Sequence, residues 1–274
     1  MKSWIFILLL AQSCFIYSDE TINLGSNREI FIDDFLIESL KGLEIRLEKP
    51  RDEGIVHKFD KSWEGPFCGY STVIKDKDKF YLYYRGLPKA GKDGSNDETT
   101  CVITSSNGTN WKRPKLNLFL KHKYPNNNII LANSAPVTHN FSPFLDTNKN
   151  TDKIHRFKSL GGTEKSGLIA YSSPDGIIWN KLGTGPVFTK GIFDSQNVSF
   201  WSESENCYIC YFRTWTGGGY SGFRTVSRTT SKDFIEWTDP VKMSFGDTPL
   251  EHLYTKQTHP YYRAPHIYLG IAAR

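Results

Sequence analysis

The segment Ser172-Ser-Pro-Asp-Gly-Ile-Ile-Trp179 decides the fold, because two further stretches of the chain repeat its pattern. These are Ser105-Ser-Asn-Gly-Thr-Asn-Trp111 and Thr229-Thr-Ser-Lys-Asp-Phe-Ile-Glu-Trp237. All three share Ser or Thr, one residue, Asp or Asn, Gly or Phe, two residues and then Trp. The Asx side chain can bond nearby backbone amides, and glycine supplies the positive φ that such a turn requires. Each Trp is then expected to begin the next strand and to pack between neighbouring sheets.

Strands are expected at fixed distances from these turns, in the order short, aromatic, alternating and Trp-containing. The short strands are residues 70–75, 141–145, 197–201 and 254–258. The aromatic strands are residues 79–85, 155–160, 207–213 and 266–271. Repeated units of about sixty residues with four strands each are typical of β-propeller blades. A β-sandwich is the main alternative, but it would not place a turn and a Trp at a fixed point of every unit.

The composition favours an all-β chain. Its 274 residues include 7 Trp, 14 Tyr and 18 Phe but only 2 Met, and aromatic side chains suit a pleated, half-buried surface. Hydrophobic residues make up 38% and charged residues 23%, which excludes a disordered chain, a collagen-like fibre and a polytopic membrane protein. We predict a β-propeller of four-stranded blades, five-bladed when complete, with about three and a half blades in this chain. Because residues 266–271 are only the second strand of a fourth unit, we expect the domain to be truncated at the C-terminus.

Residues 1–18 have the pattern of a secretory signal peptide. Lys2 gives a positive start, Trp4 to Leu10 is continuously apolar, and small or apolar residues precede Asp19. The stretch is too short for a stable membrane span, and no other segment approaches that length. We therefore expect a secreted or periplasmic protein whose propeller domain is 19–274. A bacterial lipoprotein anchored at Cys14 is the alternative, because residues 10–14 loosely match a lipoprotein cleavage box.

The charge pattern and the motifs argue against several function classes. Net charge is +5 without any run of five or more like charges, so nucleic acid is not an expected partner. The histidines lack metal-ligand spacing, and Gly217-Gly-Gly219 has no following helix to cradle a phosphate. Neither a metal nor a cofactor is therefore expected, and the sequence leaves open whether a calcium ion lies in the propeller channel. Cys207 and Cys210 lie on an expected strand, where their sulfurs point to opposite faces, so they are expected to be buried structural thiols. Export permits disulfides, and the sequence leaves the pairing of Cys68, Cys101, Cys207 and Cys210 open.

The repeated turn, the aromatic second strands and the leader resemble the five-bladed β-propeller glycoside hydrolases, the invertase, levanase and arabinanase-like superfamily of families 32, 43 and 68. The resemblance covers roughly residues 28–274 as blade architecture. The turn is also similar to the Asp box of sialidases, but Asp175 and Gly176 are adjacent here, whereas one residue separates them in that box. The Trp-x-Asn-Asp-Pro-Asn-Gly, Arg-Asp-Pro and Glu-Cys segments of family 32 are absent. The resemblance thus implies a divergent branch that hydrolyses glycosidic bonds with two or three carboxylates in the propeller funnel.

Candidate site residues follow from this expectation, because a ligand in a propeller meets the side chains at the start of each first strand. Glycoside hydrolysis needs two carboxylates that face each other across a sugar, one as general acid and one as base or nucleophile. The acids at these positions, and hence the expected catalytic residues, are Asp194, Glu251 and Glu64. The expected sugar-binding residues are His139, Asn140, Gln196, Asn197, Trp63 and Trp215. The structural alternative is that Asp194 caps a loop, that Gln196 bonds backbone, and that the two glutamates are solvated loop acids.

The function predicted from the sequence is a secreted glycoside hydrolase that acts on a polysaccharide or oligosaccharide. A neutral glycan is the default substrate, and the excess of Lys and Arg is also compatible with an anionic one. A non-catalytic carbohydrate-binding propeller and an extracellular protein-interaction propeller are the alternatives, since a fold does not fix a chemistry. No particular oligomeric state is predicted.

Overall fold

A computed structural model of the chain describes residues 22–89, 91–119 and 124–273. The chain divides into two units, Met1–Lys49 and Pro50–Arg274. The described residues of the first unit, 22–49, form turns and bends without a strand or a helix. The signal peptide expected at 1–18, with Cys14, lies outside the described residues. In the part of the chain that the structure describes, no helix has the length and apolar character needed to cross a membrane.

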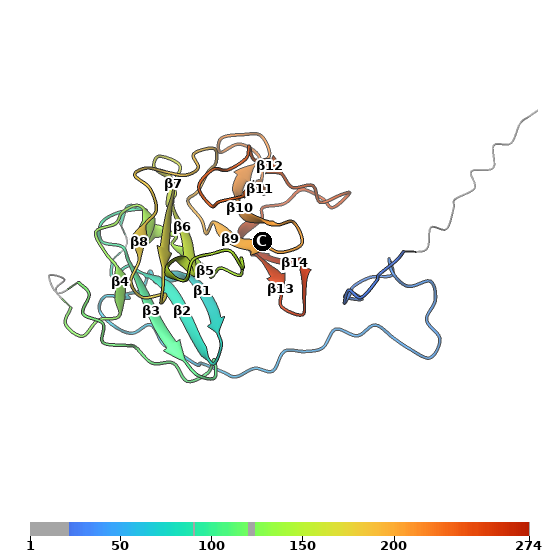
Figure 1. The fold of residues 1–274 in the computed structure, drawn as a ribbon, viewed down its shortest axis with the longest axis horizontal. Coiled ribbons are helices and arrows are strands. Elements are labelled where there is room, and N and C mark those ends of the chain that lie inside the picture. The colour runs from blue at the N-terminus through green and yellow to red at the C-terminus, as the bar shows by residue number, and fades with distance from the viewer. Residues whose placement is uncertain (1–21, 90, 120–123, 274) are drawn as a thin grey trace, which may run out of the picture. The chain divides into compact units, whose positions relative to one another are not determined.

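The second unit contains three four-stranded antiparallel sheets and one two-stranded sheet, each with its strands in chain order (Figure 1). The first sheet holds β1 (Gly69–Asp76), β2 (Lys79–Gly86), β3 (Thr99–Ser105) and β4 (Ile129–Leu131). The second holds β5 (Ser142–Leu145), β6 (Phe157–Thr163), β7 (Gly167–Ser173) and β8 (Asn180–Lys181). The third holds β9 (Val198–Ser202), β10 (Cys207–Trp215), β11 (Arg224–Ser231) and β12 (Val241–Lys242). The last holds β13 (Tyr254–Tyr261) and β14 (Ala264–Ala273), and two short 3₁₀ turns cover Val137–His139 and Lys153–His155.

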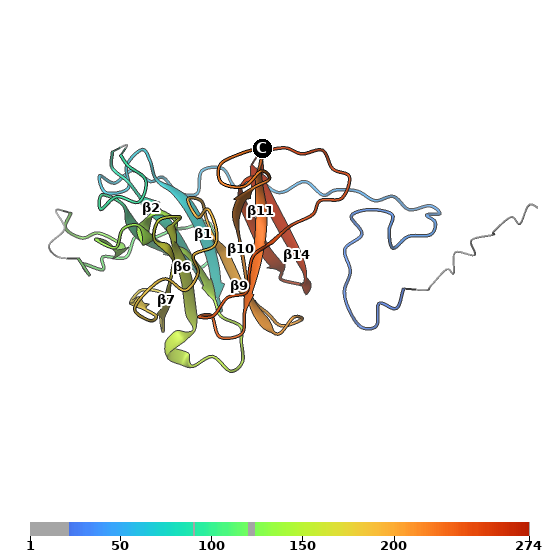
Figure 2. The same cartoon turned by 90° about the horizontal axis from the view of Figure 1, so that it is seen from above.

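The sheets are arranged as propeller blades. The first strand of each sheet packs against the first strand of the next, β1 on β5, β5 on β9 and β9 on β13. These strands lie towards the middle of the unit, whereas β4, β8 and β12 lie at its periphery (Figure 1). In the side view of Figure 2, β1 and β9 again lie towards the middle. The predicted all-β propeller is confirmed, with three complete blades and two strands of a fourth in the described residues.

The repeated turn has the same hydrogen bonds in all three blades. In the second blade, the hydroxyl of Ser173 accepts the backbone N–H of Asp175 at 3.3 Å and that of Gly176 at 2.8 Å. The Asp175 carboxylate then accepts two further backbone N–H groups, both at 2.8 Å. The Gly or Phe that follows the Asp or Asn of the motif has a positive φ in all three blades: Gly108 at +79°, Gly176 at +75° and Phe234 at +71°. The turn predicted from the sequence is therefore confirmed, including the blade in which Phe stands in place of Gly.

The fourth strands differ from the prediction that each Trp begins one. β8 does start directly after Trp179, but β4 and β12 start well after Trp111 and Trp237. Beyond Trp111 only Lys112 pairs with the neighbouring strand, in an isolated bridge to Thr104. Pro114 and Pro240 follow the two Trp residues, and a proline has no N–H to donate to a sheet. The pairing with the third strand therefore stops at each proline and resumes at β4 and at β12.

Aromatic side chains fill the space between blades. Tyr83 of β2 reaches the second blade, where its hydroxyl donates to the carbonyl of Gly176 at 3.0 Å and its ring meets Trp179 edge-on at 6.2 Å. Phe141 contacts the same Trp179 at 4.9 Å. Trp179 thus packs between two sheets, as the sequence predicted, and such pairs add stability beyond the area they bury.

The cysteines agree with the expectation of structural thiols. The four cysteines within the described residues are free, and Cys101, Cys207 and Cys210 are buried. Burial raises the pKa of the Cys210 thiol to about 11, although the Ser199 hydroxyl opposes this shift. A thiol that stays protonated at neutral pH is a poor nucleophile and a poor metal ligand. The Cys207–Cys210 spacing is therefore a feature of the core.

The substitution Asp233→Ala tests the stabilising role of the repeated turn. Partial burial would raise the pKa of Asp233, but the backbone N–H groups of Glu236 and Ile235 and the Ser231 hydroxyl lower it below the ordinary value of 3.8. Removing this acceptor should cost about 1–2 kcal/mol of unfolding free energy in urea titrations at pH 7. Because the pKa of Asp233 is lower in the folded chain than in the unfolded chain, the ionised carboxylate stabilises the fold above the unfolded pKa. This stabilisation is lost as the pH falls below about 4. Asp247→Ala, in an exposed loop, is the control; equal stability of both variants at pH 7 would contradict the assignment.

Candidate functional site

Asp194 is an accessible carboxylate at the start of the third blade. It precedes β9, its side chain is 34% exposed, and it forms an ion pair with the guanidinium of Arg213 on β10. Tyr70, at the start of β1, donates its hydroxyl to the backbone carbonyl of Asp194 at 3.2 Å. Tyr70 has a φ of +51° at an irregularity in the β1–β2 register. Such a conformation is costly for a non-glycine residue and is often retained at functional sites.

A second group of charged side chains contacts the Tyr70 ring. The Nδ1 atom of His139 is 2.8 Å from Glu98 Oε1 and 3.1 Å from a terminal nitrogen of Arg85. Arg85 also stacks on the Tyr70 ring, with its guanidinium carbon 4.7 Å from the centroid. Burial raises the pKa of the Tyr70 hydroxyl, and the bond with Tyr254 and the negative charge of Asp93 act in the same direction. Tyr70 therefore contacts the backbone of Asp194 through its hydroxyl and the group that contains Asp93, Glu98 and His139 through its ring.

Asp93, Glu98 and His139 place one potential ligand atom each within 4.8 Å of one another. Glu98 and His139 are fully buried, whereas Asp93 is exposed. Arg85 already brings a positive charge to 3.8 Å from Glu98, which disfavours a second cation at the same carboxylate. We therefore assign these residues to an ion-pair network in which Asp93 offers the accessible carboxylate.

The predicted polar residues beside Asp194 are used mainly to hold its loop. The side-chain amide of Asn140 donates to the carbonyls of Gly162 at 2.8 Å, of Ser195 at 2.9 Å and of Phe193. The side-chain amide of Asn197 also donates to the carbonyls of Phe193 at 3.2 Å and of Ser195 at 3.0 Å. These bonds fix the backbone on both sides of Asp194. Both amides are buried, so they orient the carboxylate instead of facing a sugar.

Gln196, two residues before β9, connects the first strands of two other blades. Its amide nitrogen donates to Thr72 Oγ1 on β1 at 3.1 Å, and its oxygen accepts from Gln257 on β13 at 2.5 Å. The side chain is 4% exposed. Gln196 therefore braces the strands beneath Asp194.

Trp215 lies in a group of aromatic and arginine side chains on the third blade. The Arg224 guanidinium is 4.8 Å from the Trp215 ring and 5.5 Å from the ring of Tyr254 on β13. Arg213 lies 5.9 Å from the same Tyr254 ring, and the Tyr254 hydroxyl is 3.3 Å from that of Tyr70. This group is therefore continuous with Asp194 and Tyr70.

Glu64 has a structural environment, which corrects its predicted catalytic role. Its carboxylate is fully buried and accepts two hydrogen bonds from Arg113, at 2.8 and 2.9 Å. It also accepts the Tyr84 hydroxyl at 2.5 Å and the backbone N–H of Lys61 at 2.9 Å. None of these partners belongs to the group around Tyr70, and a carboxylate bonded on both oxygens is not free for a substrate.

Trp63 is likewise a core residue and not a sugar platform. Its indole N–H donates to Asn128 at 2.8 Å, and its ring packs against the hydrophobic cluster that contains Tyr84 and Cys101. Both the indole N–H and the apolar ring of Trp63 therefore contact residues of the first blade.

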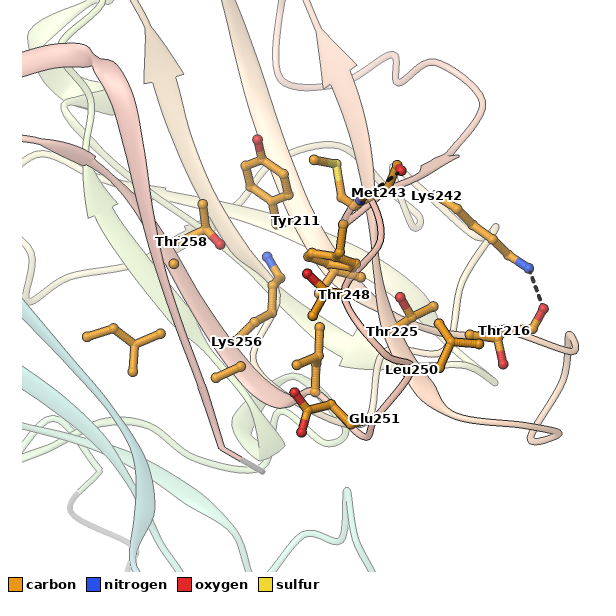
Figure 3. Close-up of a pocket in the computed structure, with 18 of the residues that line it drawn as sticks. Tyr211, Thr216, Thr225, Lys242, Met243, Thr248, Leu250, Glu251, Lys256 and Thr258 are labelled. Carbon is orange, nitrogen blue, oxygen red and sulfur yellow. Dashed lines mark hydrogen bonds between the residues drawn. The ribbon is translucent and has the colours of Figure 1, made fainter. Parts of the chain in front are cut away.

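Glu251 lines a cavity of about 960 Å³ between the third blade and the β13–β14 hairpin (Figure 3). The cavity wall includes Lys256, whose amine is buried without a hydrogen-bond partner and lies 4.4 Å from the Tyr211 ring. Burial lowers the pKa of this amine well below its ordinary value. Glu251 therefore has a different setting from Asp194, and its neighbour His252 is the residue that reaches the aromatic group, 5.9 Å from Trp215.

Several residues of the site were not foreseen in the sequence. Arg85 and Arg213 are the last residues of the aromatic strands expected in two different blades. A charged residue at the end of a buried strand could therefore have marked both as candidate site residues. Glu98 directly precedes the buried β3 strand, which is a weaker signal of the same kind. Asp93, Tyr70 and Arg224 carry no local mark, because only the folded chain brings them together.

Comparisons with known proteins bear on the fold. No family model and no curated protein matches the chain. Similar solved structures include an arabinanase from Bacillus subtilis, with 11% identity and a TM-score of 0.44 over 69% of this chain and 63% of its own. A glycosyl hydrolase from Bacteroides ovatus shares 15% identity with a TM-score of 0.46, over 69% of this chain and 55% of its own. A fructofuranosidase from Schwanniomyces occidentalis in complex with fructosylnystose shares 17% identity with a TM-score of 0.48, over 76% of this chain and 42% of its own.

The chain therefore spans between 42% and 63% of the length of these three proteins.

Proposed function

We propose that the protein is a secreted glycoside hydrolase whose reaction takes place against Tyr70, between Asp194 and Asp93. The observation that carries this proposal is that Tyr70 connects two accessible carboxylates. Its hydroxyl donates to the backbone carbonyl of Asp194, which precedes β9. Its ring contacts His139, whose ring nitrogen lies within 4.8 Å of a carboxylate oxygen of Asp93, in the loop between β2 and β3. Hydrolysis of a glycosidic bond needs two such carboxylates with a sugar between them. Tyr70, Tyr254 and Trp215 add aromatic surface of the kind that contacts sugar rings.

The surroundings of the two carboxylates suit different tasks. Asp194 forms an ion pair with Arg213, and we assign it the role of a nucleophile or of a base that activates water. Asp93 is then the group that gives its proton to the leaving oxygen. Glu98 and His139 are buried beneath Asp93 and serve as positioning residues, and Asn140 and Asn197 hold the loop of Asp194.

Asp93→Asn tests this assignment. A carboxamide cannot donate the required proton, so we expect hydrolysis to fall about 10²-fold or more. The measurement is the release of reducing ends from a panel of neutral and acidic polysaccharides and oligosaccharides. Asp97→Asn is the matched control, because it removes an exposed acid from the same loop and should leave the rate unchanged.

Two results would overturn the proposal. One is that the parent protein hydrolyses no glycan of the panel, and the other is that both variants are as active as the parent. Binding of a glycan without any hydrolysis would instead support the non-catalytic carbohydrate-binding alternative.

A further inference from the structure

We infer that the site takes an anionic sugar, whose carboxylate or sulfate group binds between Arg213 and Arg224 beside Trp215. The inference rests on the proposed function for the reaction, but it concerns binding and is tested separately. It is carried by the placement of these three side chains on one face of the third blade.

Sheet geometry brings the three side chains to the same face. Arg213 and Trp215 are two residues apart on β10, so their side chains point to the same side of the sheet. Arg224 on β11 is directly opposite Trp215 in the antiparallel register, and directly opposed residues also share a face. The contacts agree, with the Arg224 guanidinium 4.8 Å from the Trp215 ring.

These side chains present donors without acceptors. The Nε atoms of Arg213 and Arg224 and the indole nitrogen of Trp215 are all buried without a hydrogen-bond partner. Buried polar groups are almost always satisfied in native proteins. Three donors of this kind, two of them cationic, call for a ligand group that carries several acceptor oxygens and a negative charge.

The charges around this face favour an anion as well. Burial lowers the pKa of the Arg213 guanidinium, and the positive charge of Arg224 adds to this effect, so the two cations are close enough to repel each other. Asp194 pairs with Arg213, and Glu164 is an exposed acid that accepts the Tyr220 hydroxyl at 2.8 Å. Arg224 makes no ion pair with a described residue; its backbone N–H donates to His252 at 3.0 Å. An incoming anion would offset the repulsion between Arg213 and Arg224.

Binding of monosaccharides to the full chain tests the inference. D-glucose, D-glucuronate and D-glucose 6-sulfate are titrated by calorimetry at low salt. At least one of the two anionic sugars should bind about tenfold more tightly than glucose, because hydrogen bonds between charged groups are stronger than those between neutral groups. Preference for glucuronate identifies a carboxylate and preference for the sulfated sugar identifies a sulfate. If neither anionic sugar binds more tightly than glucose, the inference is wrong.

Variants of one strand locate the preference. Arg224→Gln should abolish it, whereas Arg228→Gln should preserve it, because Arg228 lies on the same strand but pairs with Glu205. Both substitutions remove one positive charge, so an equal loss in both would attribute the preference to net charge and contradict the site. If Arg224→Gln fails to fold, Arg224→Lys replaces it in the test. This variant keeps the positive charge and should retain part of the preference for the anionic sugar. Because these sugars have no glycosidic bond to cleave, the result is independent of whether the protein hydrolyses glycans.

Discussion

Asp194→Asn should lower the rate of glycan hydrolysis by about 10³-fold or more, while binding of the glycan persists. The carboxylate is accessible, and a carboxamide can act neither as a nucleophile toward the sugar nor as a base toward water. The loop should keep its shape, because Asn140 and Asn197 hold its backbone and not the Asp194 side chain. The measurement is single-turnover hydrolysis of the best substrate from the glycan panel, with binding followed by calorimetry.

Asp239→Asn is the control for this substitution, because Asp239 is an exposed acid that pairs with Lys190 on the surface. It should leave both hydrolysis and binding unchanged. A rate for Asp194→Asn within about threefold of the parent, where about 10³-fold is expected, would remove Asp194 from the reaction.

Glu64→Ala should destabilise the protein by about 3–5 kcal/mol, because it leaves Arg113 without its buried partner. A typical domain has about 5–15 kcal/mol of stability in total, so much of the chain should be unfolded at moderate temperature. The Tyr84 hydroxyl and Arg113 would both lose their main acceptor. Urea titration followed by tryptophan fluorescence measures the effect.

Glu203→Ala provides the contrast. Glu203 forms an ion pair with Lys149 at 2.7 Å, but its side chain is 69% exposed, and exposed pairs contribute little to stability because water screens them. If Glu64→Ala instead keeps the stability of the parent and loses hydrolysis, Glu64 is catalytic after all, as its place before the first strand suggested.

The blades could be predicted from the sequence because their signals are local. The repeated turn is made by side chains that bond backbone amides two or three residues away, and the aromatic strands follow from composition and alternation. The fourth strands could not be placed in the same way. Their positions depend on where Pro114 and Pro240 interrupt the ladder and on where the chain finds the neighbouring strand again.

The site was predictable only where a residue is marked by its own position. Asp194 became a candidate because it precedes a first strand. Glu98 and His139 are 41 residues apart, and Tyr70 and Tyr254 approach each other from opposite ends of the propeller unit, so neither pair has a spacing that could be recognised. Glu64 occupies the same local position as Asp194, and only the folded chain, with its burial and its bonds to Arg113 and Tyr84, shows that it is structural.

A crystal structure of the Asp194→Asn variant with an oligosaccharide that the parent cleaves is the most direct test of the proposed reaction. We predict that a sugar ring lies against Tyr70, with the glycosidic oxygen within about 3.2 Å of the Asp93 carboxylate and the neighbouring anomeric carbon facing position 194. A sugar bound elsewhere, such as in the cavity beside Glu251 and Lys256, would contradict the assignment of the reaction to Asp194 and Asp93.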